Sequence, residues 1–175
     1  MKEMIIGVDV DLTVVDTLTE WLNWYERETG HEIKSFEGLS WNIDRLMVNH
    51  KDPMSFWKQG DLYDGLKPLK NSVEVLEKLS QNHQVVFVSH CEPEHEFSKR
   101  KFLDKYFPFS SGFVSTGDKH FVRCDIFIDD SGKMLKKFPE TVKTIMFKNI
   151  LNENQLHERM DWEEIYNYFK NLKGI

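Results

Sequence analysis

Short, unbroken apolar runs recur along the chain and predict buried β-strands. Four of them are rich in Val, Ile and Phe and do not alternate with polar residues, namely residues 4–8, 85–88, 125–128 and 144–147. A run without alternation is typical of a strand that is covered on both faces, as in a parallel sheet. We therefore expect these strands to lie side by side in the interior of the protein.

Between these runs, the apolar residues change to helical spacing. Asn71 with Glu74 predicts a capping box at one helix start, and Asp161 with Glu164 predicts another. Pro93 is suited to the first turn of a third helix. Strands that alternate with helices predict an α/β fold with a doubly wound, Rossmann-like parallel sheet and right-handed crossovers.

Residues 16–69 interrupt this alternation, because they contain helical fragments and no convincing strand. Thr17 with Glu20 predicts a capping box, and Gly30 predicts the end of that helix. We interpret the segment as a helical cap placed over the carboxyl ends of the strands, where open α/β sheets bind ligands. The predicted domains are thus an α/β core and a cap, with the boundaries 1–15 plus 70–175 and 16–69.

Composition and charge narrow the classes of function. The chain has 175 residues and a formal net charge of −6, which repels polymeric nucleic acid but permits a small phosphorylated ligand beside a metal ion. No apolar run approaches the ~20 residues of a membrane span, and no secretory leader is visible. Only two cysteines are present, which is consistent with a reducing cytoplasm. We expect a cytoplasmic protein without a membrane partner.

Carboxylates follow two of the predicted strands. Asp9 and Asp11 come at the end of the first, and Asp129 and Asp130 at the end of the third. Buried carboxylates are costly without a cation, and Mg²⁺ prefers oxygen ligands. One aspartate can then attack phosphorus while another transfers protons. The alternative is that these residues only form turns and helix caps, but two acidic strand ends in one sheet favour a shared divalent ion.

Two further positions suggest a phosphate site. Ser89 places a hydroxyl at the end of the second strand, where the backbone N–H groups that follow can hold phosphate oxygens. Lys119 can neutralise charge on a phosphoryl group. Taken singly, the serine is equally consistent with a turn and the lysine with a solvated loop, so their weight comes from their order along the chain.

That order resembles the four motifs of the haloacid dehalogenase-like hydrolases: Asp9-x-Asp11-x-Thr13, Ser89, Lys119 and the Asp129–Asp130 pair. The resemblance narrows to the 5'(3')-deoxyribonucleotidase family, because the run from 116 to 130 has that family's spacing. The helix and strand over residues 69–89, the helix that ends at 106–108 and the late Asp161-Trp162 are also similar. The likeness covers essentially the whole chain and is weakest across the helical insertion.

The resemblance implies a role for each matched residue. Asp9 is the expected nucleophile and a metal ligand, and Asp11 is the expected general acid and base, with its backbone carbonyl on Mg²⁺. Ser89 and Lys119 are expected to hold the transferring phosphoryl group. Asp130 is an expected metal ligand, and Asp129 beside it is expected either as a ligand or in support. Thr13 and His90 are further expected residues of the phosphate site. The implied reaction is hydrolysis of a nucleoside monophosphate through a phospho-aspartate.

Five positions depart from the family's pattern. Leu12 stands where a glycine is usual, Ser89 replaces a threonine, and Gly117 replaces an arginine that relatives often carry. His90 and Cys91 follow Ser89 where smaller polar residues are common. These departures bear on substrate preference more than on the chemistry.

Aromatic residues are concentrated in the predicted cap. Four of the five tryptophans fall there, namely Trp21, Trp24, Trp41 and Trp57. The same segment contains Tyr25, Phe36, Phe56 and Tyr63. A small helical subdomain needs large side chains for its own core, and an aromatic surface also stacks nucleobases. Trp21 and Tyr25 share the face of Leu18 and are expected in the core, whereas Trp24 and Tyr63 are the better candidates for a substrate pocket.

The sequence is consistent with more than one metal site, substrate and oligomeric state. The histidines and Cys91 of residues 90–96 raise a zinc site as a minor alternative, although their spacing fits no common framework. The basic run 99–101 is interpreted as the solvated face of a helix. The substrate is expected to be a (deoxy)nucleoside monophosphate; the alternatives are a sugar phosphate or a catalytically silent phosphate-binding module. By analogy with similar capped enzymes, a homodimer is a candidate oligomeric state.

Overall fold

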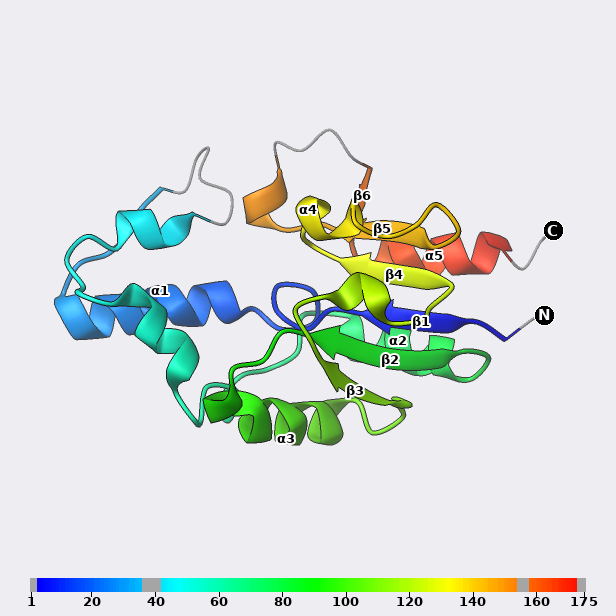
Figure 1. Cartoon of the computed structure of the whole chain (residues 1–175), viewed down its shortest axis with the longest axis horizontal. Coiled ribbons are helices and arrows are strands. Elements are labelled where there is room, and N and C mark those ends of the chain that lie inside the picture. The colour runs from blue at the N-terminus through cyan, green and yellow to red at the C-terminus, as the bar shows by residue number, and fades with distance from the viewer. Residues whose placement is uncertain (1–2, 36–41, 154–157, 173–175) are drawn as a thin grey trace.

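A six-stranded parallel sheet forms the centre of the protein. The computed structural model describes residues 3–35, 42–153 and 158–172. The strands are adjacent in the order β3-β2-β1-β4-β5-β6, and every pairing between them is parallel (Figure 1). Their bounds are β1 Ile5–Val8, β2 Gln84–Ser89, β3 Gly112–Ser115, β4 Ile126–Asp129, β5 Lys143–Phe147 and β6 Arg159–Met160.

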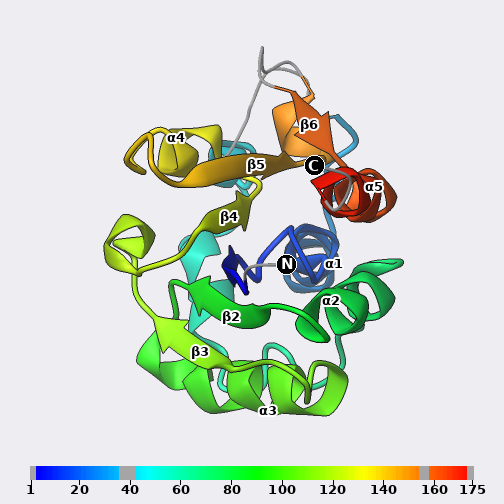
Figure 2. The same cartoon turned by 90° about the vertical axis from the view of Figure 1, so that its right-hand side faces the viewer.

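Helices cover both faces of this sheet. The α-helices are α1 Thr17–Thr29, α2 Ser72–Ser80, α3 Glu96–Tyr106, α4 Gly132–Leu135 and α5 Trp162–Leu172. Short 3₁₀ helices span Ile43–Leu46, Pro53–Lys58, Pro93–His95, Lys119–Phe121 and Ile150–Asn152. Helices α2 and α5 lie on one side of the sheet and α4 on the other (Figure 2). The predicted doubly wound α/β fold is therefore confirmed.

Close packing between β1 and β4 depends on a glycine. The two strands pair with Gly7 opposite Phe127. A Cβ atom at Gly7 would collide with the Phe127 ring, so a side chain there would force the ring to move. This pairing matters for function, because β1 and β4 are the strands that end in the acidic residues.

The four predicted strands all form, with bounds that differ by a residue at some ends. The sequence pattern missed β3 and β6. Strand β3 pairs with β2 alone and three of its four residues are exposed, so it lacks the continuous apolar run of a central strand. Strand β6 has only two residues, Arg159 and Met160.

Helix ends agree only partly with the predictions. Gly30 ends α1 in a left-handed conformation with φ of 71°, as predicted. Asp161 and Glu164 do form the reciprocal capping bonds, each carboxylate accepting from the other residue's backbone N–H. The cap of α1 is Asp16, which accepts from Thr19 N, so the predicted box at Thr17 is wrong by one residue.

Asn71 also differs from its predicted role. It precedes α2 with φ of 66° and its side chain makes no capping hydrogen bond. Ser72 instead bonds backward, donating from Oγ to the carbonyl of Leu69 at 2.7 Å. The chain therefore enters α2 through a tight backbone turn.

The segment between β1 and α2 is helical in its described part, which holds α1 and the 3₁₀ helices Ile43–Leu46 and Pro53–Lys58. In Figure 1 it extends beyond the carboxyl ends of the strands, on the side opposite both chain termini. None of the described helices combines the length and the apolar character that crossing a membrane requires.

Candidate active site

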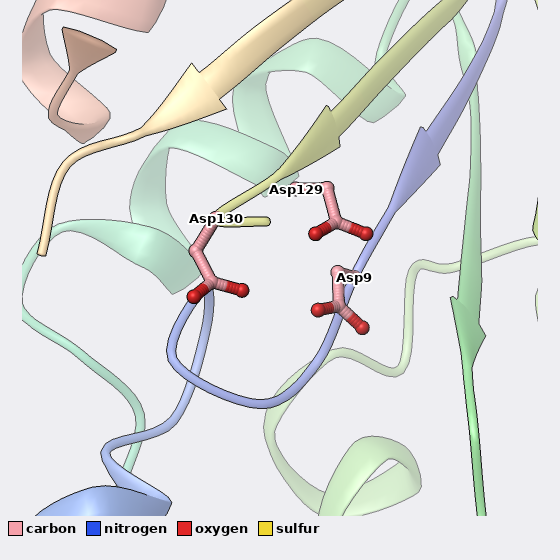
Figure 3. A group of neighbouring side chains, drawn as sticks. All are labelled: Asp9, Asp129 and Asp130. Carbon is pink, nitrogen blue, oxygen red and sulfur yellow. The ribbon is translucent and has the colours of Figure 1, made fainter. Parts of the chain in front are cut away.

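Three carboxylates meet at the carboxyl ends of the two central strands. Asp9 follows β1, Asp129 ends β4, and Asp130 is the next residue. Because β1 and β4 are paired, these side chains lie close enough for one oxygen from each to fall within 4.8 Å of the others. Figure 3 shows the three carboxylates around a common space. Their residues are at most 4% exposed.

Lys119 bridges two members of this cluster. Its ammonium lies 2.6 Å from Asp9 Oδ1 and 2.8 Å from Asp129 Oδ2. The other oxygen of Asp129 accepts a hydrogen bond from the backbone N–H of Ser131 at 2.8 Å. Both oxygens of Asp129 are thus engaged by protein donors.

Asp130 has a different surrounding. Asn149 donates from Nδ2 to one Asp130 oxygen at 2.8 Å, and Asn152 donates to the Asp130 main-chain carbonyl. Asn149 and Asn152 belong to the loop after β5, which therefore orients Asp130 toward the cluster.

Negative charge exceeds positive charge in the cluster. Burial raises the pKa of Asp9 from an ordinary 3.8 to about 7, with Lys119 opposing the rise and Asp129 adding to it. Burial, with the charges of Asp129 and Asp9, also holds the pKa of Asp130 well above its usual range. One ammonium does not balance three carboxylates. A hard divalent cation would do so, and the all-oxygen donor set suits Mg²⁺.

Asp11 is held by a separate set of donors. Lys99 Nζ lies 2.8 Å from its Oδ2, and the hydroxyl of Tyr63 donates to Oδ1 at 2.6 Å. Ser89 Oγ also donates to Oδ2, at 3.2 Å. Burial would raise the pKa of Asp11, but the Lys99 charge and the hydrogen bonds from Lys99 and Tyr63 outweigh it and lower the pKa. The free protein therefore favours the ionised form of Asp11.

Lys99 corrects one sequence interpretation. The run 99–101 was expected on a solvated helix face, yet Lys99 is fully buried and also donates to the His90 carbonyl at 2.8 Å. Helical spacing contains the signal, because Phe102 and Leu103 lie three and four residues further along the same buried face of α3. Arg100 and Lys101 remain partly or fully exposed, as expected.

A cavity of about 750 Å³ opens over the cluster. Its floor includes Asp9, Ser89 and Lys119, and the helical segment contributes Trp21 and Trp57 to its wall. The remaining lining residues are Asp11, Asp44, Met54, His90, Glu92, His95, Gly117, Asp129, Asp130, Ser131, Lys133 and Met134. Its volume falls within the range typical of small-molecule sites, roughly 300–1,000 Å³.

Both tryptophans of α1 are buried in the core, as predicted for Trp21, but Trp21 and not Trp24 is the one that also lines the cavity. Trp21 lines the cavity, and its indole N–H donates to the carbonyl of Pro53. Trp24 packs into the interior of the helical segment, with its ring centroid 4.6 Å from that of His50 and 5.7 Å from that of Phe56. Helix periodicity cannot separate these two faces, because both are buried. Two other aromatic residues that were considered, Phe36 and Trp41, lie outside the described residues.

Thr13 and His90 occupy different environments. His90 lines the cavity and its Nε2 lies 3.2 Å from Glu92 Oε1. Thr13 is fully buried, and its carbonyl accepts from the Trp162 indole at 2.9 Å, which ties the loop after β1 to α5. Thr13 is not among the described residues that line the cavity.

The family described as "5' nucleotidase, deoxy (Pyrimidine), cytosolic type C protein" matches residues 3–173. The chain belongs to this 5'-nucleotidase family. The predicted enzyme class, a phosphomonoester hydrolase of the 5'-nucleotidase type, is confirmed at the level of the family.

Relatives support the assignment over nearly the full length. The chain is 27% identical to a 5'(3')-deoxyribonucleotidase of Bacillus subtilis over 165 residues, which cover 92% of this chain and 95% of the relative. It is 24% identical to a nucleotidase of Clostridium acetobutylicum over 181 residues, with coverage of 95% and 93%.

Solved structures support the fold. A haloacid dehalogenase-like family protein from Streptococcus pneumoniae superimposes with a TM-score of 0.61 at 15% identity, covering 95% of this chain and 98% of that one. A putative beta-phosphoglucomutase from Thermotoga maritima gives 0.62 at 16% identity, covering 98% and 100%. The predicted resemblance to haloacid dehalogenase-like hydrolases is confirmed.

The loop after β1 contains a leucine with a left-handed backbone conformation. Leu12 adopts φ of 57°, in the left-handed region that favours glycine, and its side chain is buried. Its backbone N–H donates to the carbonyl of Val15 at 2.8 Å, which closes the loop. The chain thus keeps the backbone conformation of a glycine while carrying a leucine.

The minor zinc reading finds no support in the site. The only group of potential metal-binding side chains among the described residues is the aspartate cluster. His95 is committed elsewhere, since its Nδ1 lies 2.6 Å from the Trp57 carbonyl and its Nε2 accepts from Glu92 N.

Proposed function

We propose that this protein is a magnesium-dependent 5'(3')-deoxyribonucleotidase that forms a phospho-aspartate on Asp9. The observation that carries the proposal is the buried cluster of Asp9, Asp129 and Asp130, bridged by Lys119 and opening on a cavity that a nucleotide would fill. Family membership and the names of the relatives favour a deoxynucleotide substrate.

The proposed metal ligands are Asp9 and Asp130, with the main-chain carbonyl of Asp11 as the family resemblance implies. Asp129 is the weaker candidate for direct ligation, because both of its oxygens already accept from Lys119 and Ser131. We assign it the supporting role of holding Lys119 beside Asp9. A bound Mg²⁺ would neutralise the carboxylates and polarise the phosphoryl oxygens.

In the first proposed step, an Asp9 oxygen forms a bond to phosphorus while the ester bond to the nucleoside breaks. Lys119 and the hydroxyl of Ser89 hold phosphoryl oxygens, and protonated Asp11 gives its proton to the leaving oxygen. Because its donors favour ionised Asp11 in the free protein, this role requires that a proton be gained when substrate binds.

In the second proposed step, ionised Asp11 accepts a proton from water. The water oxygen bonds to phosphorus, the bond between phosphorus and Asp9 breaks, and inorganic phosphate leaves. The hydrogen bonds to Asp11 in the free protein favour the protonation state that this step needs.

Substrate selection is assigned to residues 16–69, which we propose act as a cap domain on the core formed by 1–15 and 70–175. Trp21, Met54 and Trp57 present apolar surface to the cavity above the carboxylates. An aromatic side chain that stacks on a nucleobase contributes roughly 1–3 kcal/mol. With the two cysteines free and buried, we propose a reducing compartment, the cytoplasm.

The test is phosphate release from a panel of deoxy- and ribonucleoside monophosphates and sugar phosphates, with and without Mg²⁺. We expect metal-dependent turnover of deoxynucleotides that disappears in Asp9→Asn and persists in Asp104→Asn, a control that removes an exposed carboxylate of α3. Turnover of sugar phosphates alone would overturn the nucleotide assignment. Absence of Asp9-dependent turnover, together with no trapping by a trifluoro-beryllium phosphate mimic, would favour a silent binding module.

A further inference from the structure

Asp11 accepts hydrogen bonds at both of its oxygens, and two of its donors, Tyr63 and Lys99, come from different parts of the chain. Tyr63 lies in the turns after the 3₁₀ helix Pro53–Lys58, within the proposed cap, and donates to Oδ1. Lys99 comes from α3 of the core and donates to Oδ2. A carboxylate that accepts a hydrogen bond from a separate donor at each oxygen cannot rotate without losing one of these hydrogen bonds.

Tyr63 is itself firmly placed by α3. Its backbone N–H donates to Ser98 Oγ at 2.9 Å, and Ser98 in turn donates to Asp64 Oδ1 at 2.9 Å. The Tyr63 ring lies 6.0 Å from the Phe102 ring, and the Lys99 ammonium is 5.0 Å above its centroid. The residue is 1% exposed, so its hydroxyl position is determined by packing.

The hydroxyl remains a donor under ordinary conditions. Burial, followed by the charge of Asp11, raises the phenol pKa well above 10. Tyr63 is also absent from the described residues that line the cavity, although the sequence placed it among the substrate contacts. Its environment therefore points to Asp11 as its partner, in place of the substrate.

We propose that Tyr63 is a positioning residue through which the cap orients the general acid and base. This inference rests on the proposed function of Asp11. It implies that the cap contributes to the chemical step as well as to substrate binding, since the Tyr63 hydroxyl keeps the Asp11 carboxylate directed beside Ser89 and Lys99.

The first test is Tyr63→Phe, which removes one oxygen and retains the ring. We expect kcat for a deoxynucleoside monophosphate to fall roughly 10- to 100-fold, the range for losing a hydrogen bond to a charged group, while KM stays within about twofold. Tyr168→Phe is the matched control, because Tyr168 lies on α5 among Phe169 and Lys143, and its activity should equal that of the wild type. An unchanged kcat, or a raised KM at unchanged kcat, would overturn the inference.

A double-mutant cycle separates positioning from a general structural effect. In an Asp11→Asn background, Tyr63→Phe should cause no further loss of single-turnover rate, because the residue acts through Asp11. A similar loss in both backgrounds would show that the substitution damages the fold, and the inference would fail. Failure of the proposed function is distinguishable, because the wild-type protein would then release no phosphate from any nucleotide.

Discussion

In the metal-free protein, the buried charge of Asp9 should lower the free energy of unfolding by a measurable amount. The substitution Asp9→Asn should remove this destabilisation. Asp9 is 4% exposed and sits beside Asp129 and Asp130 with Lys119 as the neighbouring cation. Burial raises its pKa from 3.8 to about 7. The folded protein therefore binds a proton at Asp9 in a pH range where the unfolded chain has already released it.

The sign and size of the effect follow from that pKa. Between about pH 4 and pH 7 the folded state holds more protons than the unfolded state, so the free energy of unfolding falls as pH rises. Each pKa unit corresponds to about 1.4 kcal/mol, which places the loss from Asp9 at roughly 4 kcal/mol by pH 8. Asp9→Asn has no proton to release, so the variant should keep this stability.

Urea denaturation in the presence of a chelator measures the effect. Wild type and Asp9→Asn should have similar stability near pH 4, and the variant should be the more stable near pH 8. Added Mg²⁺ should stabilise the wild type at pH 8, because a ligand that binds the folded state raises the free energy of unfolding. The variant should respond far less, because it lacks the carboxylate of one proposed metal ligand. Asp104→Asn controls for loss of an exposed charge. If the variant were the less stable protein at pH 8 without metal, the reasoning about buried charge would be wrong.

Three further predictions concern the scaffold of the site. At Leu12, glycine should be tolerated better than alanine by about 1 kcal/mol in urea denaturation, because φ of 57° is strained for any side chain, and the reverse order would contradict the strain. Gly7→Ala should destabilise by roughly 1–3 kcal/mol, because its Cβ collides with the Phe127 ring, and an unchanged urea midpoint would contradict this. Burial lowers the pKa of His95, so its contribution to stability should be present above about pH 6.5 and be lost as pH falls through the lowered value; His95→Gln should flatten that part of the curve of denaturation midpoint against pH.

Local signals were enough to predict the framework of this protein and the meeting of acidic residues at its strand ends. Unbroken runs of apolar residues predicted the central strands, because strands buried on both faces cannot alternate with polar residues. Since paired parallel strands end at the same edge of a sheet, the acids after residues 8 and 128 could be expected to meet. Asp9, Asp129 and Asp130 lie together for that reason.

The tertiary structure alone decided which side chains surround those acids. Lys99 is buried and Arg100 is exposed, although both belong to one basic run, because only Lys99 lies on the inner face of α3. Trp21 and Trp24 are both buried, and which of them faces the cavity depends on how α1 packs on the rest of the helical segment between β1 and α2. Tyr63 reaches Asp11 across 52 positions of sequence. Such contacts are set by the packing of distant elements, and neither periodicity nor local propensity encodes that packing in a form that can be read from one sequence.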